Sequence, residues 1–347
     1  MRRDRRTAGI QPRRIALALA ATGLVAIVGC GGGGSSDAQC SFFSNVCYPV
    51  ITPPPAAAVA SVYPTRITAQ AGTSVTFTAQ TAGVDSPRFQ WRRSPDGGAN
   101  FVDVAGATAA TYTLGAAQLA DDGAVFRVDV RNSAAGTAVA SSNAGTLLVS
   151  SMPAVDFSDG EFDPAGWTAS AIADPAVNGS SHTEDRSADG GSPGAYRRMV
   201  HTMAAGPSSL RVFNTKAAAT YDPQALGAIH AVDYAEDCDR RAATSATLDV
   251  LSFATIEQAG RRYVSSRGRG CLSLWVNNFE QLPGLGAADF VQVDGPACGS
   301  GESCPDFSAK GGTLRFGFER RVRLQAGTPA GSIEHGIDNW KVRVWRR

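Results

Sequence analysis

The sequence predicts an all-β protein whose mature chain folds into two sandwich domains, at residues 58–150 and 151–347. The first observation is the alternation of apolar and polar residues in short runs such as Val75–Ala79, which is typical of half-buried strands. The second is the frequency of Gly, Pro, Asp and Ser between these runs, with no sustained helical period. The third is a shift of composition near residue 150, from Thr, Val and Ala toward Trp, Asp, Arg and Cys.

Residues 1–29 have the composition of an export signal peptide. Six arginines precede an apolar run from Ile15 to Val28, and small residues follow it. This run has 14 residues, whereas a membrane-spanning helix needs about 20. We therefore expect the segment to be removed on export rather than to span a membrane.

The residues at the end of this segment, Ile27-Val28-Gly29-Cys30, resemble the lipobox of bacterial lipoproteins. The resemblance implies that Cys30 is lipid-modified and becomes the new N-terminus, so that the membrane is a partner through this lipid. Because glycine rather than aspartate follows Cys30, the resemblance also implies the outer membrane of the cell envelope. The alternative is an ordinary secretory signal with an unrelated cysteine.

Removal of the signal peptide changes the charge of the chain. The full chain has 32 basic and 31 acidic residues; the signal peptide takes six arginines and Asp4, which leaves 26 and 30, a net charge near −4. A mildly acidic chain without a basic stripe does not suit nucleic acid. We therefore expect no nucleic-acid partner.

Seven cysteines are an odd number for an exported protein. Assigning Cys30 to lipid leaves six, which an oxidising compartment allows to pair. A metal site is disfavoured, because there is no CxxC motif and no histidine near any pair. Residues 30–57 are predicted to be a Gly/Ser and Pro-rich tether that holds one small cysteine loop. Closeness in sequence favours the pairs Cys40–Cys47, Cys238–Cys271 and Cys298–Cys304.

The first domain contains expected strands around Phe77, Trp91, Tyr112 and Phe126. Its residues resemble an immunoglobulin-like sandwich, with Trp91 as the core tryptophan and with Phe77 and Val128 in place of the two disulfide cysteines. Phe126 replaces the corner tyrosine. A register shifted by one residue would bury Arg127, and burying an unpaired charge costs on the order of several kcal/mol.

The second domain resembles the jelly-roll sandwiches of carbohydrate-binding modules and MAM-type adhesion domains. The resemblance lies in the D-F-x-x-G…G-W opening from Asp156, the G-G-x-P-G-x-Y segment from Gly190, and the closing I-D-N-W around Asp338. It implies that the first and last strands pair, that Asp156 and Asp338 lie near each other, and that they hold a structural Ca²⁺, an ion that prefers oxygen ligands. The alternative is that Asp338 caps a turn or accepts backbone amides. Further strands are expected at residues 248–253, 271–276 and 313–318.

The common catalytic motifs are missing from the sequence. None of the four histidines lies in HExxH, and there is no G-x-S-x-G and no E-x-D-x-x-E strand. Asp233, Glu236 and Asp237 remain as carboxylates for acid–base work, although such a run is commonly a solvated loop edge. We therefore expect no enzyme and no cofactor beyond the calcium, with a polysaccharide hydrolase that uses a cryptic carboxylate pair as an alternative.

A ligand site is predicted around an aromatic residue and nearby amide and guanidinium donors. Aromatic faces combined with Asn and Arg suit sugar rings and their hydroxyls. The alternative is that the aromatic residue is part of the core and the arginines are solvated. The residues are Trp275, Asn277, Asn278, Arg262 and Tyr263.

These observations predict a lipid-anchored envelope protein with a non-catalytic binding or adhesion role, toward a glycan or a surface protein. The alternative of another class is a structural envelope component without a small ligand. Fold alone does not decide between them, since sandwiches serve as spacers and as binding modules.

Overall fold

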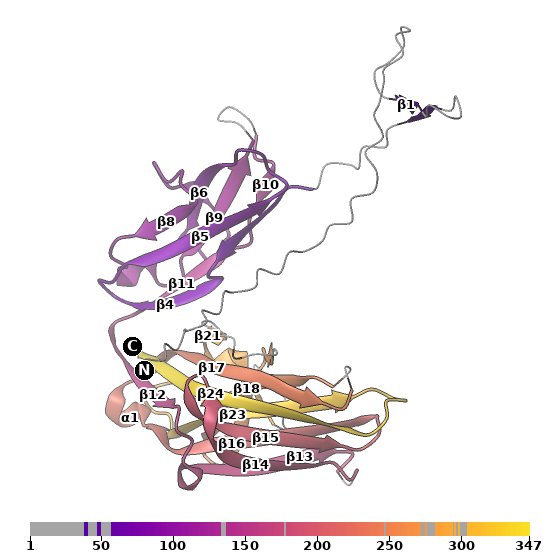
Figure 1. Ribbon diagram of the computed structural model, residues 1–347. Coiled ribbons are helices and arrows are strands. Elements are labelled where there is room, and N and C mark those ends of the chain that lie inside the picture. The colour runs from indigo at the N-terminus through magenta and orange to yellow at the C-terminus, as the bar shows by residue number, and fades with distance from the viewer. Residues whose placement is uncertain are drawn as a thin grey trace, which may run out of the picture. The chain divides into compact units, whose positions relative to one another are not determined.

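The computed structural model describes residues 57–132, 137–176, 178–245, 248–271, 275, 282–293, 295, 298 and 304–347, together with the backbone of 38–40 and 47–49. Cys30, Asn277 and Asn278 lie outside these residues. The chain divides into two compact units, Met1–Pro55 and Ala56–Arg347. Nearly all of the described elements are strands (Figure 1), which confirms the all-β prediction. In the described part, no helix is long and apolar enough to cross a membrane.

The first unit contains one described hairpin. Strand β1 (Ala38–Cys40) runs antiparallel to β2 (Cys47–Pro49). The register sets Cys40 opposite Cys47, the two cysteines that closeness in sequence pairs.

The second unit begins with the N-terminal sandwich, the name used below for residues 58–150. Two sheets face each other, with one hydrophobic core between them. Sheet A holds β4 (Arg66–Gln70), β11 (Gly145–Ser150), β9 (Val125–Arg131), β6 (Arg88–Ser94) and β7 (Val102–Asp103) in that order, with β10 (Ala140–Ser141) on β9. Sheet B holds β3 (Val59–Tyr63), β5 (Val75–Ala82) and β8 (Thr111–Leu114); a 3₁₀ turn, η1, covers Leu119–Asp121.

The core of the N-terminal sandwich is built on the residues that the sequence singles out. Phe77, Trp91, Phe126 and Val128 are fully buried. The rings of Phe77 and Phe126 stack with centroids 5.0 Å apart, and the Trp91 indole nitrogen donates to the carbonyl of Ala109 at 2.9 Å. Buried indoles need such a partner. The stacked phenylalanines thus join β5 of sheet B to β9 of sheet A across the core.

Residues 151–347 form the C-terminal sandwich, which also has two sheets around one core. Sheet C holds β14 (Ser181–Gly191), β15 (Gly194–Met203), β24 (Gly331–Arg346), β17 (Ile229–Ala243) and β21 (Leu282–Leu285), with β12 (Met152–Asp159) on β24. Sheet D holds β13 (Trp167–Asp174), β16 (Ser208–Tyr221), β23 (Leu314–Leu324), β18 (Val250–Gln258), β19 (Arg261–Ser265) and β22 (Phe290–Gln292), with β20 (Arg269–Gly270) on β18. The short helical elements are η2 (Pro164–Gly166), α1 (Pro223–Leu226) and η3 (Ala287–Asp289).

The opening motif of this domain has a structural role. The Asp159 carboxylate accepts the indole N–H of Trp167 at 2.8 Å and the backbone N–H of Phe162 at 2.9 Å, and it pairs with Lys216. These partners outweigh burial and lower the pKa of Asp159. Trp167 then packs edge-on against Trp340 of the closing strand, with centroids 5.1 Å apart. The pairing of the first and last strands, β12 with β24, follows the implied arrangement.

Two predicted disulfides are present in the C-terminal sandwich. Cys238–Cys271 joins β17 of sheet C to the residue that follows β20 of sheet D, so it ties the two sheets together. Cys298–Cys304 closes a short loop. Both pairings confirm the assignment that was based on closeness in sequence.

Candidate functional site

The predicted calcium pair does not come together. In the β12–β24 register Asp156 lies opposite Arg343, five positions along β24 from Asp338, which is about 16 Å at the rise of a strand. Arg343 donates to both oxygens of Asp156, at 2.7 and 2.8 Å, and this lowers the pKa of Asp156. The residues therefore do not fit a Ca²⁺ site shared by these two carboxylates.

Asp338 instead accepts backbone amides, as the alternative interpretation stated. The N–H groups of Ser192 and Asn339 donate to it at 2.6 and 2.7 Å. Burial nevertheless raises the pKa of Asp338. In the part of the chain that the structure describes, no group of three or more His, Cys, Asp or Glu side chains could hold a metal.

The three carboxylates considered for acid–base work lie on β17 but do not converge. Asp233 accepts the N–H of Gly284 and the indole N–H of Trp345, both at 2.6 Å, and burial raises its pKa. Asp237 accepts the side-chain amide of Asn339 at 2.8 Å. Glu236 points into the core. Each carboxylate thus has its own structural partners rather than a common reaction centre.

Arg262 lies in a cavity of about 660 Å³ beside the β18–β19 hairpin. The hairpin turns at Ala259 and Gly260, which both have positive φ, 49° and 75°, the conformation of a two-residue turn that matches strand twist. The cavity is named the hairpin groove below, and the polar residues that line it include Arg262, Glu257, Arg315, Gln292, Thr220 and Thr313.

Charge pairing fixes the arginines of the hairpin groove. Arg262 donates to Glu257 Oε1 through Nε at 3.2 Å and Nη2 at 2.9 Å, and its guanidinium stacks over the buried Phe213 ring at 4.5 Å. Arg315 Nη1 lies 3.9 Å from Glu257 Oε2, and its side chain is 51% exposed. The groove therefore offers an oriented guanidinium, a second and more exposed one, and amide and hydroxyl groups, a set that suits a hydroxyl-rich ligand.

Tyr263 does not belong to this groove. Neighbours in a strand point to opposite faces, so Arg262 faces outward while Tyr263 lies in the core, 2% exposed. The interpretation that placed both side chains at one ligand site is corrected on this point.

Trp275 lies against the other sheet. Its indole nitrogen donates to the carbonyl of Gly190 at 2.7 Å, and its ring meets Tyr196 edge-on with centroids 5.4 Å apart. The guanidinium of Arg241 lies over both rings, 4.2 Å from the centroid of Tyr196 and 5.4 Å from that of Trp275. Trp275 is half-buried among residues of sheet C, whereas Arg262 belongs to sheet D, so the two are not parts of one site.

Four arginines occupy the outer surface of sheet A, where sequence reasoning placed no site. Inward-facing Trp91 and Val128 force their strand neighbours outward. The β6–β9 register then sets arginine opposite arginine twice. This surface is named the arginine face, and its members are Arg88 with Arg131 and Arg92 with Arg127.

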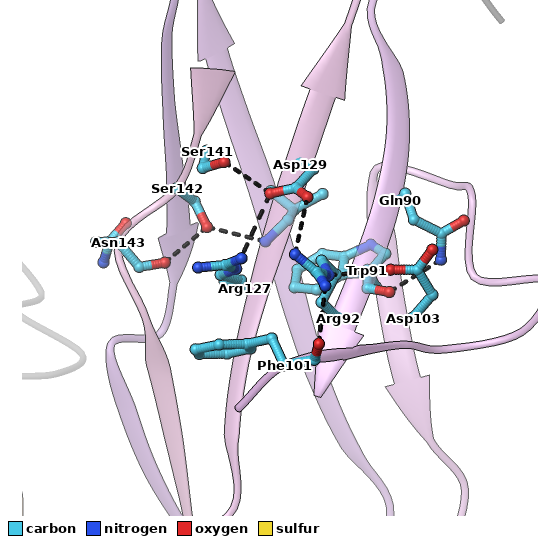
Figure 2. Close-up of polar contacts among 11 residues, drawn as sticks. Gln90, Trp91, Arg92, Phe101, Asp103, Arg127, Asp129, Ser141, Ser142 and Asn143 are labelled. Atoms are coloured by element: carbon cyan, nitrogen blue, oxygen red, sulfur yellow. Dashed lines mark hydrogen bonds and ion pairs between the residues drawn. The ribbon is translucent and has the colours of Figure 1, made fainter. Parts of the chain in front are cut away.

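Figure 2 shows the centre of the arginine face. Asp129 accepts the Ser141 hydroxyl at 2.7 Å and lies 3.5 Å from Arg92 Nη1 and 3.9 Å from Arg127 Nε. Arg92 also donates to the Phe101 carbonyl at 2.8 Å. The Arg127 guanidinium stacks on the Phe101 ring at 4.1 Å. Arg92 is thus held by several partners, whereas Arg127 is positioned mainly by stacking.

Residues 59–151 match the model of a domain of unknown function, DUF8696. The match covers the N-terminal sandwich and less than a third of the chain. No curated protein matches the sequence.

The sequence analysis also did not predict a network of buried charged side chains inside the C-terminal sandwich. Arg320 Nη1 contacts Glu236 Oε1 at 2.8 Å, with both side chains almost fully buried, and it also donates to Ser252. Tyr234 donates to Glu236; burial and the neighbouring carboxylate raise the pKa of Tyr234 well above its ordinary value. The available signal was a charged residue at an inward position of β23, between Phe318 and Val322.

A histidine pair lies in the same core. His335 Nε2 is 3.1 Å from His201 Nδ1, and both side chains are fully buried. Burial, with the charge of Arg320 and a neighbouring imidazole, lowers the pKa of His201 to about 3 and that of His335 well below its ordinary value. Both rings are therefore neutral in the folded protein at physiological pH.

Proposed function

We propose that the protein is a lipid-anchored envelope protein that binds a glycan, without catalysis, in the hairpin groove of its C-terminal sandwich. The observation that carries the proposal is the fixed Arg262–Glu257 pair beside the exposed Arg315 in a cavity of about 660 Å³. Planar guanidinium donors and carboxylate acceptors suit the hydroxyl and acid groups of sugars. A cavity of this size is in the range that holds small ligands.

Export and anchoring rest on the N-terminal sequence and are supported by the cysteines. The Cys238–Cys271 and Cys298–Cys304 disulfides are typical of oxidising compartments outside the cytosol. The lipobox-like residues before Cys30 provide the site of the lipid. Lipid at Cys30 also leaves an even number of cysteines for pairing.

A Cys30→Ser variant is expected to lose its lipid and to leave the membrane fraction. Metabolic labelling with an alkyne fatty acid, followed by fractionation of the envelope, measures both effects. A Gly31→Asp variant is the control, because it keeps the acceptor thiol and should keep the label. Continued labelling of the Cys30→Ser protein would contradict the assignment.

An Arg315→Ala variant is expected to bind glycan about tenfold more weakly. A hydrogen bond to a charged group contributes about 1.5–3 kcal/mol when sheltered, and the half-exposed position of Arg315 places the loss near the lower limit. Calorimetric titration of the mature chain with purified envelope oligosaccharides gives the affinity. Arg323→Ala is the matched control, since this exposed arginine lies at the far end of the same strand. If the two variants lost glycan affinity equally, the hairpin groove would not be the binding site.

A photo-crosslinking residue at position 313, which also lines the hairpin groove, separates glycan binding from a purely structural envelope role. In intact cells we expect glycan adducts at this position. Adducts that contain only neighbouring proteins would favour the structural role instead.

A further inference from the structure

We infer that the arginine face of the N-terminal sandwich is a second binding site, for a linear glycan that carries carboxylate groups. This site is separate from the hairpin groove and does not depend on it. It consists of Arg88, Arg92, Arg127 and Arg131 on the outer surface of β6 and β9.

The first argument is the like-charge pairing across the two strands. Arg88 lies opposite Arg131, and like charges directly opposite each other destabilise a sheet. The Arg92–Arg127 pair is relieved by Asp129, which lies within 3.9 Å of both side chains. Across the described ranges, no carboxylate makes an ion pair with Arg88 or Arg131, and the Nε of Arg131 is buried without a hydrogen-bond partner.

The second argument is the distribution of charge within the domain. Residues 58–150 contain six arginines and six aspartates, so that this domain is neutral as a whole. Four of the arginines belong to the arginine face, whereas only Asp103 and Asp129 lie beside them. The positive excess is therefore concentrated on one sheet surface, which attracts anions through its local field although the chain is acidic overall.

The third argument is the shape of the surface and the spacing of its charges. The two arginine pairs lie four residues apart along β9, which is about 13 Å at the rise of a strand. An extended polymer with regularly spaced carboxylates can reach both pairs. The guanidinium groups of Arg88 and Arg131, which make no ion pair in the described residues, can each hold a carboxylate with two parallel hydrogen bonds. Arginine is also enriched at protein–protein interfaces, but the separation of the two pairs along the strands matches a polymer with regularly spaced carboxylates, so we infer a glycan rather than a protein partner.

The test uses the mature chain and oligogalacturonate of about ten sugars, a linear polymer with one carboxylate per sugar. Its methyl ester, which keeps the backbone and removes the charge, is the matched control ligand. We expect saturable binding of the acid form at low salt, binding at least tenfold weaker to the ester, and a decrease in affinity as salt is added, because counterions compete for the arginines.

An Arg88→Ala/Arg131→Ala variant is expected to bind oligogalacturonate at least tenfold more weakly than the wild type. Its melting temperature should equal or exceed that of the wild type, because the change removes a repulsive pair, so that unfolding would not explain the loss. The Arg88→Lys/Arg131→Lys variant keeps the positive charges but lacks the planar guanidinium groups, so it should bind with an intermediate affinity.

Three results would overturn this assignment. One is unchanged affinity in the Arg88→Ala/Arg131→Ala variant. Another is loss of binding in Arg315→Ala instead, which would place the acidic glycan in the hairpin groove and leave the proposed function intact. The last is tighter binding to phosphatidylglycerol vesicles than to oligogalacturonate at equal charge concentration, which would make the surface a lipid-binding one.

Discussion

Replacing Arg320 with leucine is expected to lower the free energy of unfolding by about 3–5 kcal/mol. Arg320 and Glu236 are in contact at 2.8 Å, with side chains 0% and 1% exposed. Removal of the guanidinium leaves the Glu236 carboxylate buried without its counter-charge. Tyr234 also donates to Glu236, but a neutral phenol does not replace a cation.

Urea unfolding of the single and double variants measures this effect. Glu236→Leu alone should cost a similar amount, because it leaves Arg320 as the unpaired charge. The double variant Arg320→Leu/Glu236→Leu should be more stable than either single variant, since replacing both charges of a buried pair by apolar groups is often neutral. Additive losses in the double variant would show that the two charges do not stabilise each other.

Stability is expected to fall steeply as the pH decreases from about 6.5, over a range in which paired carboxylates with a lowered pKa, such as Glu319, stay ionised. The folded state keeps His201 and His335 neutral, since their pKa values are lowered, that of His201 to about 3. The unfolded chain has ordinary histidines with a pKa of about 6.5. Between these limits the unfolded state binds more protons, so its free energy falls relative to the folded state. Each pH unit below 6.5 lowers the free energy of unfolding by about 1.4 kcal/mol per histidine. For His201 alone the loss is about 3 kcal/mol at pH 4.5.

Denaturant unfolding of the wild type and of His201→Gln/His335→Gln between pH 7.5 and 4.5 isolates the histidines. The slope of stability against pH in this window should be much smaller in the variant, whatever its stability at pH 7.5. Paired carboxylates such as Glu319 have lowered pKa values, so they change the stability mainly at lower pH. Identical slopes would mean that the two imidazoles are protonated in the folded protein.

The core of the N-terminal sandwich was predictable because strand alternation decides it. Phe77, Trp91 and Val128 are at inward positions, and the register that would have buried Arg127 is not the one adopted. The same alternation did not predict the buried Arg320, because a residue at an inward position of a strand is expected to be apolar. Its partner Glu236 lies on another strand, 84 residues earlier, and no local pattern links the two.

The candidate ligand residues also show that a local sequence pattern does not predict contacts between distant segments. Arg262 lines the hairpin groove, whereas its neighbour Tyr263 faces the core. Trp275 was grouped with them by closeness in sequence, but it packs on Tyr196 of the other sheet. Which sheet a segment joins depends on strand order, and this is a property of the whole fold.

The calcium prediction failed on register rather than on strand pairing. β12 and β24 pair as the resemblance implied, but the ladder shifts between Met152 and Val155. The final alignment sets Asp156 opposite Arg343. This shift changes the partner of Asp156 by one residue only, so that Asp156 would lie far from Asp338 in either alignment. The resemblance indicated which strands pair, but not the register that sets the distance between the two carboxylates.

The most direct test of the central claim is an equilibrium titration of the mature wild-type chain with purified envelope oligosaccharides, alongside the Arg315→Ala and Arg323→Ala variants. The hairpin groove predicts saturable binding that weakens about tenfold in Arg315→Ala and is unchanged in Arg323→Ala. Absence of saturable binding by the wild type at millimolar oligosaccharide would contradict the assignment of this protein as a glycan-binding component of the envelope.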